Sequence, residues 1–328
     1  MQIPLFFHGY DLKAYDFPAG QPLSVLRERL RFHYRSMRNL QPRTGFYTAF
    51  LNLAKSLEQL GHQVRINDFA FARTNPNLPV GMSGYLPPFG QSGLKNPVLY
   101  GPGRVPDPTE LGALQAQLNL KIVTYPSEWP KELAAKDMPI TYAAMFVGID
   151  TDEWPDMSGS DKKVDFLLYN KIHWHKAERA QDLLAPLRQH LRDRNLTWAE
   201  LEYGSHTPAQ YKTAIRESRA LIFCTEHETQ GLACQEAMAA NVPVFAWDEG
   251  RLSDPSQIAI APPDLRPSSV PYFDARCGLT FRISTLEEQL DRFMAARDSY
   301  RPRDYVLENL SLEQGARRFL TLYESLLS

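Results

Sequence analysis

The chain has 328 residues, of which 43% are hydrophobic and 23% are charged. This apolar content can form a large core, and the length favours two domains over one. Lys and Arg number 36 against 38 for Asp and Glu, so the formal net charge is -2. No overall basic field is therefore available to hold nucleic acid, and we expect no nucleic-acid partner.

The cysteines and the apolar runs bear on where the protein resides. Cys224, Cys234 and Cys277 show no CxxC spacing, which favours reduced core residues over disulfides or zinc ligands. The first residues lack a basic start, and their apolar run is too short for a signal peptide. No stretch approaches the eighteen apolar residues of a membrane span. We expect a cytoplasmic protein.

In chain order, the first half shows few regular patterns. Residues 48–60 (TAFLNLAKSLEQL) predict a helix that ends at Gly61, because glycine commonly terminates helices. Residues 72–108 are rich in Pro and Gly and predict little regular structure beyond one strand. The strands expected in this half are residues 63–69, a segment near 97–100, and residues 121–125 and 140–147.

The second half alternates between strand and helix patterns. Short apolar runs such as VDFLLY (164–169) and ALIFC (220–224) are typical of buried parallel strands. Further strands are expected over 197–203 and 242–246, and helices over 176–194, 208–218, 232–240 and 311–327. Repeated units of this kind predict an α/β fold with a doubly wound parallel sheet.

The segment TEHETQGLACQEAMAANVPVFAW (225–247) carries the groups best suited to chemistry. It runs from a buried strand through a polar loop into a helix, and ligands of open α/β sheets bind beyond the carboxyl ends of the strands. Glu228 on the loop can accept hydrogen bonds from sugar hydroxyls, and Glu236 in the helix can accept a pair from a ribose. Gly231 allows close approach of a ligand, and the free N–H groups of the helix start suit a phosphate.

This segment resembles the Glu-x7-Glu signature of the retaining, family-4-like glycosyltransferases of the GT-B type (glycosyl transferases group 1). Glu228 and Glu236 stand at the family's interval, and Gly231–Leu232, EAMA and VPVFA are in register with it. The resemblance continues in VGIDTDEWP (147–155), in KIVTYPSEW (121–129) and in residues 44–64, which are similar to the first glycine loop and helix.

The resemblance extends to a pair of lysines. Lys171 and Lys176 follow the strand VDFLLY at the interval where the family has a basic pair that clamps the donor diphosphate. Such a clamp supplies positive charge to a leaving nucleoside diphosphate when no metal does so. Lysine at the first position lacks the planar fork of the arginine usual there. Asn170 replaces the usual glycine, and Gln230 replaces the usual aromatic residue.

The resemblance implies a GT-B fold, with two Rossmann-like domains whose parallel sheets face each other across a cleft. The expected domains are residues 1–147 on the acceptor side, residues 148–308 on the donor side, and a C-terminal helix, 309–328, that packs toward the first domain. The implied catalytic residues are Glu228, Lys171 and Lys176. The implied donor-binding residues are Gln230, Gly231, Leu232, Glu236, Asn170 and Gly45.

The implied activity is transfer of a sugar from a nucleotide-sugar donor, with retention of configuration and without a metal or other cofactor. The acceptor, whether saccharide, lipid-linked glycan or protein, is not indicated, and peripheral membrane contact stays open. The motif His173-Trp174-His175 has no third ligand at suitable spacing for a metal.

Two other functions are compatible with this sequence. Nucleotide-sugar epimerases and phosphorylases also use paired Rossmann-like domains, although the basic pair and Glu-x7-Glu argue against them. The second is a catalytically inactive GT-B protein that binds a nucleotide-sugar or acts as a scaffold. It is suggested by the stretch LYGPGR (99–104), where the family has a histidine.

Overall fold

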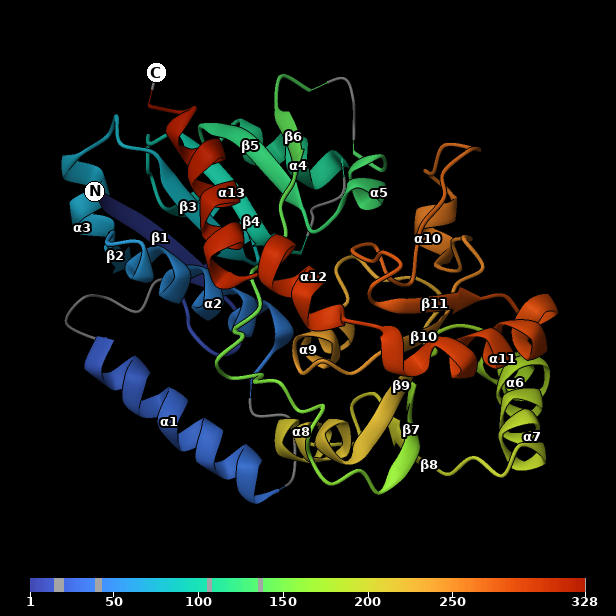
Figure 1. Cartoon of the computed structure of the whole chain (residues 1–328). Helices are drawn as coiled ribbons and strands as arrows, with labels where there is room; N and C mark the ends of the chain where they lie inside the picture. The colour runs from blue at the N-terminus through green and yellow to red at the C-terminus, as the bar shows by residue number, and fades with distance from the viewer. Residues whose placement is uncertain (15–20, 39–42, 105–107, 135–137, 328) are drawn as a thin grey trace. The chain divides into compact units, whose positions relative to one another are not determined.

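The computed structural model describes residues 1–14, 21–38, 43–104, 108–134 and 138–327. The chain divides into two compact units, which are described separately (Figure 1). Unit 1 comprises Met1–Gly148 and Leu310–Ser328, and unit 2 comprises Ile149–Asn309. In the described residues, no helix is both long enough and apolar enough to cross a membrane.

Unit 1 contains a six-stranded parallel sheet in the order β2-β1-β3-β4-β5-β6. Because β1 pairs with both β2 and β3, the chain first extends the sheet on one side and then on the other. The strands are β1 Gln2–His8, β2 Gln63–Ile66, β3 Val80–Gly84, β4 Val98–Gly103, β5 Leu120–Tyr125 and β6 Thr141–Ala144.

Both faces of this sheet are covered by helices, and β1 shows why. Side chains alternate between the two faces of a strand, so Phe7 packs on Phe50 while Phe6 packs on Phe69 of the other layer. All four of these side chains are buried, because a parallel sheet is covered on both faces. The helices of unit 1 are α1 Gln21–Met37, α2 Gly45–Gln59, α3 Phe69–Thr74, α4 Pro108–Gln115, α5 Glu128–Lys131 and α13 Leu312–Glu324, with a 3₁₀ turn at Pro87–Gln91.

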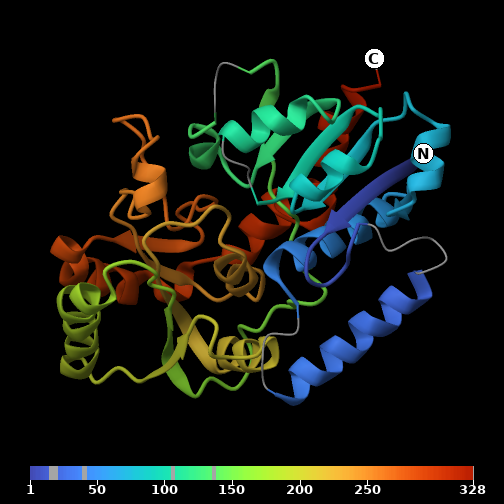
Figure 2. The ribbon, with the colours of Figure 1, turned by 180° about the vertical axis from the view of Figure 1, so that it is seen from behind.

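The C-terminal helix α13 completes unit 1, beside α2 (Figure 2). Phe319 is fully buried in the α2 layer, and the Tyr323 hydroxyl donates to the Pro79 carbonyl at 2.6 Å. The Arg318 Nε donates to the Ala144 carbonyl at 3.0 Å. Residues from opposite ends of the chain therefore share one core.

Unit 2 contains a five-stranded parallel sheet in the order β11-β10-β9-β7-β8. Its strands are β7 Val164–Asn170, β8 Trp198–Glu202, β9 Ser218–Cys224, β10 Val244–Trp247 and β11 Gly278–Phe281. The chain builds outward from β7 to β8 and then reverses to β9, so the order of the strands switches between β7 and β9.

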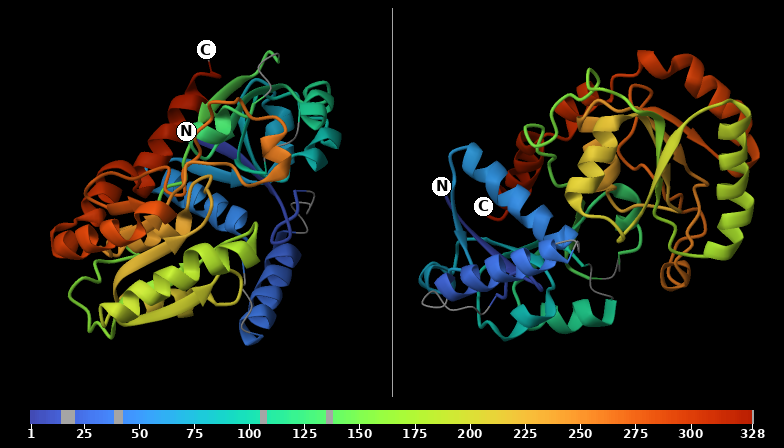
Figure 3. Two further views of the ribbon diagram at one scale, coloured as in Figure 1. Left: turned by 90° about the vertical axis from the view of Figure 1, so that its right-hand side faces the viewer. Right: turned by 90° about the horizontal axis from the view of Figure 1, so that it is seen from below.

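Helices cover both faces of this sheet as well. The layer from Lys176 to Asp193 (yellow-green in Figure 3) packs on Phe166 and Ile222, together with Phe293 of α11. The helices of unit 2 are α6 Lys176–Arg179, a π-helical turn Ala180–Leu184, α7 Ala185–Asp193, α8 Pro208–Glu217, α9 Leu232–Ala239, α10 Pro255–Ile258, α11 Leu286–Ala296 and α12 Pro302–Asn309, with 3₁₀ turns at Ile283–Thr285 and Arg297–Ser299.

Two expectations about secondary structure were wrong. The strand expected over 63–69 ends at Ile66, because the Asp68 side chain accepts from the Phe71 N–H and starts α3. Residues 72–108 contain β3, which has two glycines and no alternating pattern. An ideal Cβ at Gly81 would lie 2.6 Å from Leu5 Cδ2, so close packing of β1 explains this glycine.

Candidate functional site

The reversal between β7 and β9 places two loops side by side at the carboxyl edge of the unit 2 sheet. The segment after β7 begins with Lys171, whose N–H donates to the Cys224 carbonyl at 2.8 Å. Ligands of open α/β sheets bind where the strand order switches in this way. The candidate site is therefore built from residues 170–176 and 225–236.

Lys171 and Glu228 contact each other across these loops. The Lys171 Nζ lies 2.5 Å from Glu228 Oε1, and the side chains are only 19% and 9% exposed. The same Nζ lies 4.7 Å from the centroid of the Tyr203 ring, a distance at which an aromatic face attracts a cation. A partly buried ammonium and a carboxylate thus stand together at the switch point.

Glu226 joins the two loops, and the sequence analysis did not select it. Its carboxylate accepts from the backbone N–H of Trp174 at 2.9 Å and of His173 at 3.2 Å. Glu226 is 4% exposed. The only signal in the sequence is a second acid two residues before Glu228, and no spacing rule predicts that it bonds a backbone fifty residues earlier.

Trp174 and His227 stack on each other, with ring centroids 5.0 Å apart and planes inclined by 25°. Burial lowers the pKa of His227. Desolvation also lowers the pKa of His173, and the nearby Lys171 charge contributes to this shift. Both imidazoles are therefore held toward the neutral form, which can both accept and donate hydrogen bonds.

Gly231 is the N-cap residue of α9 and has a left-handed conformation with φ of +84°. Gln230, in the preceding position, is buried and forms two bonds with Gln235: its Nε2 donates to Gln235 Oε1, and its carbonyl accepts from Gln235 Nε2, each at 2.9 Å. Leu232 is the first residue of the helix. To bind a donor as predicted, Gln230 would therefore have to use its backbone, or its side chain would have to release Gln235.

Glu236 lies in the second turn of α9 and is partly buried. Desolvation raises its pKa to about 8, the Glu153 charge adds to this, and Lys212 opposes it. Burial raises the pKa of Tyr169 and of Tyr211, and the Glu236 charge adds to both shifts. A ligand that donates hydrogen bonds to such a carboxyl group stabilises its ionised form.

Lys176 and Asn170 flank the Lys171–Glu228 pair. Lys176 is the first residue of α6, 64% exposed, and its Nζ lies 3.7 Å from Glu202 Oε1, which is also exposed. Exposed pairs at this distance contribute little. Asn170 ends β7, and its Oδ1 accepts from the Ile172 N–H at 3.2 Å, so it shapes the turn that leads to Lys171.

Gly45 is in unit 1, where it is the first residue of α2. The preceding Thr44 caps this helix by accepting from the Tyr47 N–H, and its hydroxyl donates to Asp11 Oδ2 at 2.7 Å. An ideal Cβ at Gly45 would meet nothing within 4 Å. The local packing of unit 1 therefore does not require glycine here.

The His173-Trp174-His175 motif is engaged with other side chains. His173 contacts the Tyr203 ring edge-on at 5.6 Å, and His175 Nδ1 lies 3.7 Å from Glu178 Oε2. Within the described part of the chain, no three His, Cys, Asp or Glu residues are grouped so that they could hold a metal ion.

No protein-family model matches the chain, and no curated protein is significantly similar to it in sequence. Solved structures are similar along its whole length. AviGT4, a glycosyltransferase involved in avilamycin A biosynthesis, matches at 13% identity, 99% coverage of this chain, 98% coverage of its own, and a TM-score of 0.56. A glycosyltransferase from Rickettsia africae matches at 13% identity, with 100% of this chain and 99% of its own chain covered and a TM-score of 0.57.

Sucrose-phosphate synthase from Thermosynechococcus elongatus matches at 12% identity, with 99% of each chain covered and a TM-score of 0.54. Together with the two parallel sheets, these likenesses decide the fold. The chain has the GT-B fold. The predicted α/β class with two Rossmann-like domains is confirmed, and the strand order of the second sheet puts the candidate site at its switch point.

Proposed function

We propose that this GT-B protein is a glycosyltransferase that moves a sugar from a nucleotide-sugar donor to an acceptor, with retention of configuration and without a metal ion. The observation that carries the proposal is the contact between Lys171 and Glu228 at the switch point. A GT-B fold alone would not be enough, because one fold supports many functions.

Charge is the basis of the proposed mechanism. As the donor breaks, negative charge accumulates on the leaving diphosphate, and a preorganised cation stabilises that charge. Lys171 is held at the site by Glu228 and Tyr203. We assign Lys176, on the neighbouring turn, to the same diphosphate, and the free N–H groups at the start of α9 add to the positive potential.

The carboxylates have separate proposed roles. Glu228 positions Lys171 and accepts from hydroxyls of the donor sugar. Glu236, with its raised pKa, accepts from the ribose hydroxyls and becomes ionised on binding. Asn170, Gly231, Leu232 and the backbone of Gln230 shape the donor pocket in this proposal. For Gly45, which belongs to unit 1, the donor-binding role stays a prediction.

Thermal-shift measurements with UDP, GDP and ADP test the proposal. One nucleotide class is expected to raise Tm in the presence of EDTA, because a ligand that binds only the folded state stabilises it. Lys171→Met and Lys176→Met should each remove most of this increase. Lys163→Met is the matched control, since Lys163 precedes β7 at the opposite edge of the sheet and also pairs with a glutamate, Glu217 at 2.6 Å.

Three results would contradict the proposed activity. The first is a strict requirement for Mg²⁺ or Mn²⁺ in sugar transfer. The second is an equal loss of binding in Lys163→Met. The third is a product whose anomeric configuration, read by NMR, is inverted.

A second candidate is an inactive GT-B protein that binds the donor as a scaffold. The end of β4 favours it, because Tyr100, Gly101 and Pro102 occupy the stretch where family members have a histidine, and the Tyr100 hydroxyl donates to the Gly84 carbonyl at 2.7 Å. Nucleotide binding with neither sugar transfer nor donor hydrolysis would support this candidate.

A further inference from the structure

Helix α1 carries its apolar side chains toward solvent. Five of its apolar residues, which we call the α1 stripe, fall within an arc of about 80° at 100° per residue. The residues of the α1 stripe are Leu23, Leu26, Leu30, Tyr34 and Met37. Their exposed fractions are 70, 52, 63, 53 and 65%, in that order. In a helix that serves only the fold, this face would be the buried one.

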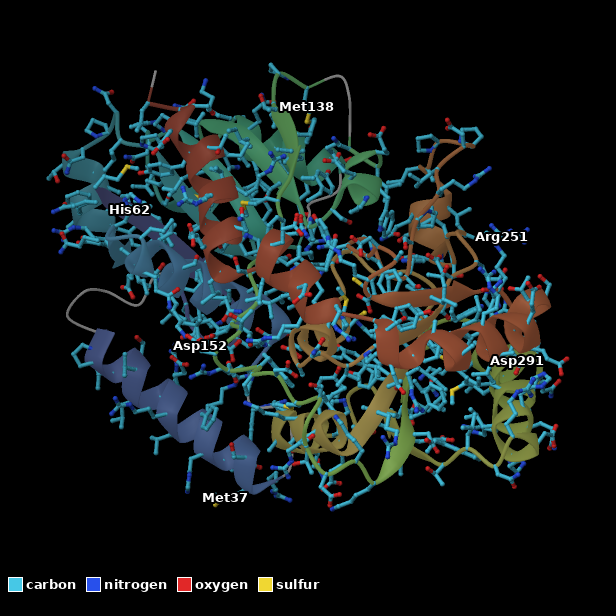
Figure 4. All side chains as sticks on the ribbon, in the orientation of Figure 1. Met37, His62, Met138, Asp152, Arg251 and Asp291 are labelled. Carbon is cyan, nitrogen blue, oxygen red and sulfur yellow. The ribbon has the colours of Figure 1, made fainter. Side chains whose placement is uncertain are left out.

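The opposite face of α1 holds the helix to unit 1 through polar residues, although Val25 and Phe32, which are 44% and 41% exposed, also lie on that side. Glu28 Oε2 accepts from the Tyr47 hydroxyl of α2 at 2.8 Å, and Arg31 forms an ion pair with the buried Asp11. Ser24 on the same side is 3% exposed. Figures 1 and 2 show α1 running along the outside of unit 1, and Met37 projects from its end in Figure 4.

These polar anchors determine which way the α1 stripe points. Rotating the helix to bury its leucines would leave Asp11 without Arg31 and Tyr47 without Glu28, and uncompensated buried polar groups are costly. The outward stripe is therefore a stable feature of the fold. An exposed row of five large apolar side chains with a polar rim is typical of a binding surface.

The rim of the stripe indicates the partner. Arg27 and Arg38 border it on one side, and Arg29 and His33 border it on the other. Residues 21–38 contain five arginines and one glutamate, a net charge of +4 with histidine neutral. Helices with a leucine-rich face and arginines along its borders lie in the interface of anionic bilayers.

A second copy of the chain fits this surface less well. Pairing two α1 stripes would bring arginine rims against arginine rims, and the one acidic residue, Glu28, is engaged on the opposite face. Like charges opposed in this way disfavour association.

We propose that α1 binds the surface of an anionic lipid bilayer, with the α1 stripe inserted among the acyl chains and the arginine rim at the headgroups. The helix would lie in the plane of the membrane, because 17 residues interrupted by charges cannot span it. This inference does not depend on the proposed activity, since vesicle binding requires no donor or turnover.

Co-sedimentation of the full chain with vesicles tests the inference. Binding to mixed phosphatidylcholine and phosphatidylglycerol vesicles should be at least about tenfold tighter than to phosphatidylcholine alone, and should weaken as salt rises. Leu26→Ser combined with Leu30→Ser should reduce it at least about tenfold. Arg29→Gln combined with Arg38→Gln should bring it near the level for neutral vesicles.

Matched controls separate the stripe from exposed apolar surface in general. Ile258 and Ile260 are 53% and 55% exposed in unit 2, so Ile258→Ser combined with Ile260→Ser removes similar area and should leave vesicle binding unchanged. A dye on Leu30→Cys should shift to an apolar spectrum on binding, whereas one on Ile260→Cys should not. The three native cysteines are buried, so labelling is selective.

The inference is overturned if anionic vesicles bind no better than neutral ones, or if the serine variants bind as the parent does. It is also overturned if light scattering shows a dimer that depends on Leu26 and Leu30 while vesicles are not bound. Nucleotide-induced thermal shifts measured on the same variants keep failure of this inference distinct from failure of the proposed activity.

Discussion

Glu236 is a carboxyl group in a place where its charged form is poorly solvated. Desolvation raises its pKa from an ordinary value of 4.5 to about 8, with Glu153 as the second cause. The folded protein therefore holds a proton on Glu236 between these two pH values, whereas the unfolded chain does not. The free energy of unfolding must then decrease as pH rises through this range.

Replacing Glu236 with glutamine should remove this pH dependence. We expect the unfolding free energy of Glu236→Gln to exceed that of the parent at pH 9 by on the order of 2 kcal/mol, less than the full shift implies because the side chain is partly exposed. The two should agree near pH 4. Urea unfolding at pH 4, 7 and 9 measures the difference.

Glu287→Gln is the control for this measurement, because Glu287 is 67% exposed on α11. Its unfolding free energy should follow that of the parent at every pH. A Glu236→Gln curve parallel to the parent curve would show that the folded protein does not raise the pKa of Glu236.

Individual residues differ in how far the sequence predicts them. Lys171 and Glu228 were selected from local motifs, and the structure brings them to 2.5 Å. Their roles in donor binding remain predictions. Glu226 was not selected, because its partners are backbone N–H groups of another loop. Motifs report side-chain types at a spacing and contain nothing about which backbone a distant carboxylate meets.

At the scale of elements, apolar runs and periodicity predicted the second half well. Strands β7, β9 and β10 and helices α8 and α9 are confirmed within two residues at each end, and α13 ends three residues before the expected position. The patterns hold there because buried parallel strands are continuous apolar runs and covering helices have one apolar face. Helix α1 breaks this rule, since its apolar face is outside.

Two glycines at the starts of helices provide a test at this scale. Gly231→Ala forces a side chain into a φ of +84°, and we expect it to lower the free energy of unfolding by about 1–2 kcal/mol. Gly45→Ala places its Cβ in open space at the start of α2. It should leave stability unchanged or raise it by up to about 1 kcal/mol.

Urea unfolding of both variants compares these effects. Equal stability of the two variants would show that the left-handed backbone at position 231 does not require glycine. Because Gly45→Ala is expected to fold normally, a selective loss of nucleotide-sugar turnover in that variant would support the proposed donor role of Gly45.

For the whole molecule, the central feature is the return of the chain end to unit 1. Gly315 of α13 lies against Gly148, so closely that an ideal Cβ on Gly315 would stand 2.6 Å from the Gly148 nitrogen. Glycine within a helix is ordinarily a weakness of about 1 kcal/mol relative to alanine. Here it permits two backbone segments, far apart in sequence, to approach each other.

Replacing a helical glycine with alanine usually raises the free energy of unfolding, but at the contact between Gly315 and Gly148 it should lower it. Gly315→Ala should lower the free energy of unfolding by about 1–3 kcal/mol, because backbone atoms must move apart. Gly112→Ala in α4 meets only the end of the Met138 side chain, at 3.2 Å, and should be neutral or stabilising. If the Gly315→Ala variant were more stable than the parent, the contact between Gly315 and Gly148 would not be closely packed. Denaturant unfolding of both variants measures this.

The sequence by itself determined the α/β class, most elements of the second half and the residue types at the switch point, because these depend on local periodicity and on motifs within one loop. Only the tertiary structure decided that β1 lies between β2 and β3 in its sheet, that Glu226 joins two loops, and that α1 turns its leucines outward. Each of these depends on contacts between residues distant in sequence, whose energies no local pattern contains.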